Sequence, residues 1–90
     1  MSPGIMALAL AGCRLYRNIE HGGWRIALGP ITNTCPLIGI FASDNRWQRA
    51  QSFTPSRYAE CEWADLPAQY TVAVSEVEAI MDWLERGGEA

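Results

Sequence analysis

The fold is decided near the C-terminus by residues 75–86, which read SEVEAIMDWLER. Apolar side chains recur in this stretch at helical spacing, and Ser75 followed by Glu78 has the form of a capping box. A Gly-Gly pair comes next, and glycine commonly ends a helix. The stretch predicts an amphipathic helix over 76–86 with Ser75 as its N-cap. Such a short helix is marginal alone, so we expect its apolar stripe to pack on a sheet.

Upstream of this helix, alternating apolar and polar residues predict the strands of an antiparallel sheet. Residues 13–29 contain two alternating segments around a Gly-Gly pair, which is typical of a β-hairpin. A short apolar run and another alternating segment predict a second hairpin over 37–53, and a further alternation predicts a strand over 69–74. We therefore expect a single α+β domain over 1–90, with about five antiparallel strands and the C-terminal helix packed on one face.

Two segments do not have a clear period. Residues 5–12 are apolar and fit either a first strand or one or two helical turns. Residues 55–66 fit neither period, and we interpret them as a loop that can contain a helical turn.

Length and composition exclude several classes of protein. Hydrophobic residues make up 49% of the chain and charged residues 19%, which excludes a disordered or collagen-like protein. No apolar run reaches the roughly 18 residues that a membrane span requires, so we expect no membrane partner. The net charge of −3 argues against nucleic acid as a partner, because such binding relies on an excess of Lys and Arg.

Charge is distributed unevenly along the chain. Residues 1–59 carry a net charge of +4 and residues 60–90 a net charge of −7. The two parts can neutralise each other on folding or present an electrostatic face to a partner. All seven basic residues are Arg, whose planar guanidinium pairs with carboxylates and stacks on aromatic rings such as those of the four Trp.

The three cysteines, Cys13, Cys35 and Cys61, are odd in number and widely spaced. This pattern predicts free thiols and a cytoplasmic location rather than a disulfide framework. With His21 they form a nominal Cys₃His set, but no pair has the spacing of a zinc knuckle, so we expect no metal and no cofactor. Residues 10–13, LAGC, resemble a lipoprotein motif, yet no positive charge precedes them and we do not expect lipidation.

Catalytic signals are weak. His21 is the single histidine, and it lies in a Gly-rich turn where a solvated polar residue is ordinary. Glu60, Glu62 and Asp65 are close in sequence, but a solvated acidic surface is the simpler interpretation. We therefore expect no catalytic residues and no enzymatic activity.

The strongest candidate for a binding surface is the segment Arg46-Trp47-Gln48-Arg49. Trp and Arg are enriched among interface hot spots, so we expect Arg46, Trp47 and Arg49 to bind a partner, with Arg25 as a neighbour. The predicted partner is a protein with an acidic patch. The competing interpretation places Trp47 in the core and leaves the Arg residues as solubilising edge charges. If these Arg residues are not the site, the acidic stretch 60–65 is the next candidate.

These observations predict a small non-enzymatic interaction protein: a regulator, an inhibitor or an assembly component, for example from a phage or another mobile element. A homodimer is expected, because short sheet edges need covering and because the charges of the two parts of the chain are opposed. The alternative is a small enzyme or a small-ligand-binding protein with its pocket between sheet and helix or between subunits.

Overall fold

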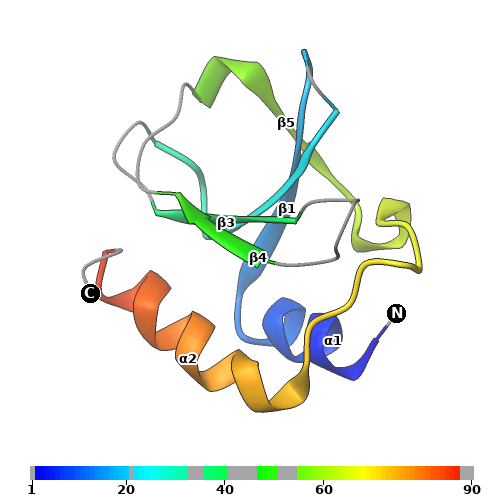
Figure 1. Cartoon of the computed structure of the whole chain (residues 1–90). Coiled ribbons are helices and arrows are strands. Elements are labelled where there is room, and N and C mark those ends of the chain that lie inside the picture. Colours follow the sequence, from blue (N-terminus) through cyan, green and yellow to red (C-terminus); the bar gives the residue numbers. More distant parts are fainter. Residues whose placement is uncertain (1, 21, 33–35, 41–46, 51–54, 88–90) are drawn as a thin grey trace.

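The computed structural model describes residues 2–20, 22–32, 36–40, 47–50 and 55–87, and for residues 40, 47–50 and 55 it describes the backbone. In this part of the chain, five antiparallel strands form one sheet and two helices lie together on one side of it (Figure 1). The expected α+β architecture with an antiparallel sheet and a C-terminal helix is therefore confirmed.

The sheet has the order β4-β3-β2-β1-β5. Its strands are β1 (Cys13–Asn18), β2 (Trp24–Leu28), β3 (Leu37–Ile40), β4 (Trp47–Ala50) and β5 (Tyr58–Cys61). Pairing of β1 with β2 and of β3 with β4 confirms the strands of the predicted hairpins 13–29 and 37–53. The connection 41–46 and residues 51–53 lie outside the described residues.

The predicted strand over 69–74 is wrong, and the fifth strand is β5 instead. Residues 55–66, expected to be a loop, contain β5 between two 3-10 helices, η1 (Pro55–Arg57) and η2 (Trp63–Asp65). Tyr70 and Val72 are buried alternately without a strand partner, because their segment runs along α1 (Pro3–Leu10), where Gly4 approaches the Val72 carbonyl. The alternation therefore reflects burial of an extended segment and not a sheet ladder.

The undecided N-terminal segment is helical. Ser2 caps α1 by accepting a hydrogen bond from the Ile5 amide at 3.3 Å, and proline follows at the first helical position. Ser and Pro at these two positions are favourable helix starts. Ile5 and Leu8 are fully buried, so the helix is part of the core.

The C-terminal helix is α2 (Val74–Glu85), and the predicted cap at Ser75 is wrong. The N-cap is Ala73, whose carbonyl accepts from the Glu76 amide at 2.9 Å, and Ser75 lies within the first turn. The helix starts earlier than predicted, directly after Val72, which is buried in the core and packs beside Gly4 of α1. Among the described residues, no helix is long and apolar enough to cross a membrane.

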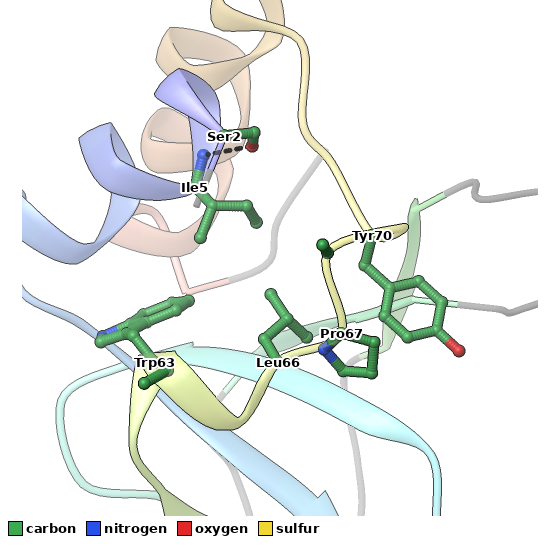
Figure 2. Close-up of a pocket in the computed structure, with 8 residues that line it drawn as sticks. Ser2, Ile5, Trp63, Leu66, Pro67 and Tyr70 are labelled. Carbon is green, nitrogen blue, oxygen red and sulfur yellow. Dashed lines mark hydrogen bonds between the residues drawn. The ribbon is translucent and has the colours of Figure 1, made fainter.

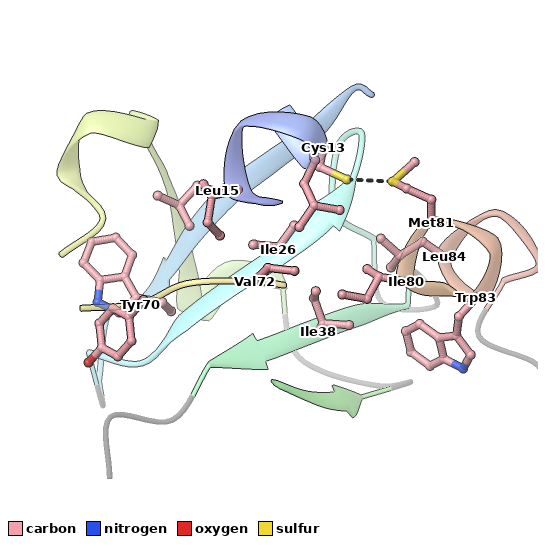
Figure 3. Packing of buried hydrophobic residues seen from close by; sticks show 13 residues of the cluster. Cys13, Leu15, Ile26, Ile38, Tyr70, Val72, Ile80, Met81, Trp83 and Leu84 are labelled. Atoms are coloured by element: carbon pink, nitrogen blue, oxygen red, sulfur yellow. Dashed lines mark hydrogen bonds between the residues drawn. The ribbon is translucent and has the colours of Figure 1, made fainter. Parts of the chain in front are cut away.

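The main core lies between the sheet and the two helices (Figure 3). It includes Leu15, Ile26 and Ile38 from three neighbouring strands, and Ile80, Met81, Trp83 and Leu84 from α2. The predicted apolar stripe of the C-terminal helix therefore packs on one face of the sheet. The opposite face carries a smaller buried cluster of Tyr16, Ala27 and Leu37.

Cys13 is part of the main core. Its side chain is 4% exposed, and its thiol donates a hydrogen bond to the Met81 sulfur at 3.4 Å (Figure 3). Lipidation of the LAGC motif would require removal of α1, whose Ile5 and Leu8 belong to the same core. In this fold the Cys13 thiol is enclosed by the core.

Candidate functional site

A recess of about 410 Å³ opens between the start of α1 and the chain that connects β5 to α2 (Figure 2). Its volume lies within the range of roughly 300–1,000 Å³ that is typical of ligand pockets. The residues that line it are mostly apolar: Ser2, Ile5, Trp63, Ala64, Leu66, Pro67, Ala68 and Tyr70. A recess of this size with a mostly apolar lining is a candidate binding site.

The polar side-chain atoms of Trp63 and Tyr70 point away from the recess, and the Ser2 hydroxyl is already engaged. In Figure 2 the six-membered ring of Trp63 faces Ile5 and Leu66, while its indole nitrogen lies on the far side. The hydroxyl group of Tyr70 points outward, and the Ser2 hydroxyl accepts the hydrogen bond that caps α1. The lining is thus mainly apolar, with a smaller polar part.

The 3-10 helix η2 positions the two largest apolar walls. Asp65 N–H donates to the Glu62 carbonyl at 2.9 Å, and the Asp65 carboxylate accepts from Glu62 N–H at 3.2 Å. A 3-10 turn brings residues three apart onto one side, so Trp63 and Leu66 line the same recess. Pro67 follows, and its carbonyl accepts from the Tyr70 amide at 3.1 Å, which turns the chain back toward α1.

Two carboxylates lie next to the recess, and none of its described lining residues is acidic. Glu62 and Asp65 are exposed and alternate along the chain with the lining residues Trp63 and Leu66. The neighbouring Glu60 is paired with Arg14 on β1, with 3.6 Å between a guanidinium nitrogen and a carboxylate oxygen. The acidic stretch 60–65 therefore contributes a local negative potential next to an apolar cavity.

The predicted hot-spot segment is placed only in part. Arg46 lies outside the described residues, as do the side chains of β4. By backbone register, Trp47 lies opposite Ile40 and Arg49 opposite Ile38.

Arg25, the predicted neighbour of this segment, lies in the next cross-strand row. It stands opposite Gly39, whereas Arg49 shares the row of Ile38 and Ile26. Its guanidinium donates to the Trp24 carbonyl at 2.9 Å and lies across Gly39, where an added Cβ atom would come within 2.8 Å of it. Because Gly39 has no side chain, there is room for the Arg25 guanidinium to lie against the sheet.

The expected stacking of Arg on aromatic rings occurs at the first hairpin. The Arg17 guanidinium carbon lies 5.3 Å from the centre of the Trp24 ring. This contact stabilises the paired ends of β1 and β2, where Arg17 is opposite Trp24 in register.

The two described thiols are poor nucleophiles. Burial, with a smaller contribution from Glu85, raises the pKa of Cys13 to about 11. Partial burial raises the pKa of Cys61 as well, assisted by the nearby carboxylate of Asp65. The described residues contain no group of three side chains that could hold a metal ion, and His21 and Cys35 lie outside them.

Hydrophobic periodicity did not predict the recess, because its main residues lie in a segment without a clear period. Trp63 and the Leu66-Pro67 pair fall in the segment whose residues fit neither a helical nor a strand period. A large aromatic residue and a proline in a nonperiodic connection are the available signal. Comparison with protein-family models, curated proteins and solved structures finds no match for this chain.

Proposed function

We propose that this chain is a non-enzymatic interaction protein that holds one apolar side chain of a partner protein in the recess. The observation that carries the proposal is the recess of about 410 Å³ with the partly exposed Trp63, Leu66 and Pro67 in its walls. Burying a leucine or phenylalanine side chain contributes roughly 1.5–3 kcal/mol. A single anchor can therefore change affinity by about 10- to 150-fold.

The charges beside the recess indicate the kind of partner. The exposed carboxylates of Glu62 and Asp65 favour a partner segment in which Lys or Arg flanks the apolar anchor. The predicted surface of Arg46, Trp47 and Arg49 would select an acidic partner instead, and it stays a separate prediction. The charge of the bound segment thus distinguishes the two surfaces.

The recess also has to be compared with a pocket for a small-molecule ligand, which is the alternative function. A ligand pocket normally covers 70–90% of the surface of its ligand. Here Ala64 and Ala68, which line the recess, are themselves exposed, so the cavity is open to solvent. An open apolar cavity suits one side chain of a larger partner better than a whole small molecule.

The proposal can be tested with a display library of short random peptides selected on the full chain. We expect enriched sequences to share a leucine or an aromatic residue next to Lys or Arg. Ala64→Arg and Ala68→Arg place a bulky side chain at the mouth of the recess without touching the core. Each should weaken binding of a selected peptide at least about 10-fold, as measured by fluorescence polarisation.

Ala79→Arg is the matched control, because Ala79 is an exposed alanine on α2 that does not line the recess. It should leave binding unchanged. Peptides rich in Asp and Glu that bind Ala64→Arg normally, but are lost with Arg46→Glu and Arg49→Glu, would overturn the recess in favour of the predicted Arg surface. Failure of any peptide to bind, with an apolar small molecule bound instead, would favour the ligand-binding alternative.

We also propose that the protein acts as a homodimer in a reducing compartment such as the cytoplasm. The compartment is supported by Cys13 and Cys61, the two described thiols, both of which are free. Thiol titration of protein from its native source would test it, and a disulfide would contradict it.

A further inference from the structure

The outer face of α1 carries an apolar stripe that the fold leaves in solvent. Leu10 is 83% exposed and Met6 is 48% exposed, and the two lie one turn apart on the same side of the helix. No charged residue occurs in residues 1–13. A helix that is apolar all round is normally covered on all sides, and this one is covered on one side by the core.

Symmetry restricts which surface of this acidic chain can meet a second copy. In a two-fold dimer the same patch of both copies is used, so residues near the axis face their own counterparts. The outer face of α2 bears exposed Glu76, Glu78 and Glu85, while Asp82 is paired with Arg86, so two copies of this acidic face would repel. The outer face of α1 has no charge to repel and exposes apolar side chains that gain from burial.

The sheet edges are less suited to pairing. The two edge strands, β4 and β5, are four residues long each, and very short edge strands are a common protection against edge-to-edge association. We therefore expect the dimer contact on another surface than the sheet edges.

We propose that two copies of this chain pair through the outer faces of their α1 helices, with Met6 and Leu10 of one copy packed against those of the other. This interface differs from the recess, because Ile5 points inward to the core while Met6 and Leu10 point outward. It leaves the recess, whose wall from η2 carries Trp63 and Leu66, available to a partner. The proposal does not depend on the function assigned to the recess.

The test is the mass of the full chain in solution, measured by light scattering and sedimentation over a dilution series. We expect the wild type to reach twice the 10.0 kDa mass of one chain at high micromolar concentration. Leu10→Glu places like charges opposite each other, and it should raise the dissociation constant at least about 100-fold. Leu10→Ala should have a smaller effect in the same direction.

Ile19→Glu is the matched control, because Ile19 is 66% exposed in the turn after β1 and does not belong to α1. It should leave the dimer intact. Circular dichroism should show that all three variants remain folded. A wild-type mass of one chain at high micromolar concentration, a dimer that survives Leu10→Glu, or equal dissociation by Ile19→Glu would each overturn the proposal. Wild-type monomers that co-sediment with phosphatidylcholine vesicles would likewise overturn it and assign the face to lipid.

Discussion

The two helices lie in one layer on the same face of the sheet, yet their outer faces have different chemistry (Figure 1). α2 buries Ile80, Met81 and Leu84 and exposes acidic residues on its outer side. α1 buries Ile5 and Leu8 and exposes apolar residues, with no charge at all. The contribution of a helix to the core is thus independent of what it presents to its surroundings.

This difference separates stability from binding in the N-terminal helix. The inward side of α1 is required for folding, because Ile5 and Leu8 are fully buried there. Its outward side is free to vary without loss of fold. Substitutions on the two sides of α1 should therefore have different effects on stability.

The largest effect is expected from truncating one core leucine on each helix. Leu8 on α1 is fully buried and Leu84 on α2 is 4% exposed. Leu8→Ala and Leu84→Ala should each lower the free energy of unfolding by about 2–5 kcal/mol, measured by urea denaturation. Leu10→Ala on the exposed side of α1 serves as the control and should change it by about 0.5 kcal/mol or less. A loss below about 1 kcal/mol for Leu8→Ala would show that α1 is peripheral to the core.

The next effect concerns the close approach of α1 to the chain that leads into α2. A Cβ atom added at Gly4 would overlap the Val72 carbonyl group. Replacing Gly by Ala inside a helix gains up to about 1 kcal/mol, whereas overpacking costs about 1–3 kcal/mol. Because the obstacle is backbone, we expect the overlap to dominate, so that Gly4→Ala lowers the melting temperature. A raised melting temperature would show that α1 does not pack closely against Val72.

A pH-dependent effect is expected at the thiol that follows α1 and contacts α2. The pKa of Cys13 is raised from 9.0 to about 11, so its contribution to stability is complete below pH 9 and is lost as the pH rises to 11. The wild-type denaturation midpoint should therefore fall over this range more steeply than that of Cys13→Ala. Equal slopes would contradict the buried position of the thiol.

Thiol accessibility gives a second readout of the same position. In a Cys35→Ser background, Cys61 should react with a disulfide reagent well before Cys13, because Cys61 is half-buried and Cys13 is enclosed by the core. Reaction of both thiols at one rate would indicate that α2 does not stay docked over Cys13.

The comparison also explains which elements could be predicted from the sequence. The C-terminal helix was recognisable because acidic residues interrupt its apolar residues at helical spacing. The N-terminal helix has no polar face, so its sequence fits a strand equally well, and only Ser2 and Pro3 mark its start. Hydrophobic periodicity identifies a helix only when one side of the helix is polar and faces solvent.

Tertiary packing accounts for the elements that were misjudged. Tyr70 and Val72 alternate because an extended segment is buried against α1, and strand pairing is not visible in such a pattern. Strand β5 has the exposed residues Ala59 and Glu60 at its centre, so its sequence has no apolar alternation. The recess escaped prediction for a similar reason, because Ile5 and Trp63 come from distant parts of the chain and meet only in the folded state.

The contact between α1 and α2 has a consequence for how the chain folds during synthesis. α1 is made before α2, and the helix that covers Ile5 and Leu8 is completed only at Glu85. At translation rates of about 5–20 residues per second, roughly 4–15 s pass between the synthesis of α1 and the completion of α2. The sheet can form meanwhile from neighbouring hairpins, whereas the helical layer closes last. The apolar side of α1 therefore lacks its helical neighbour until α2 is complete.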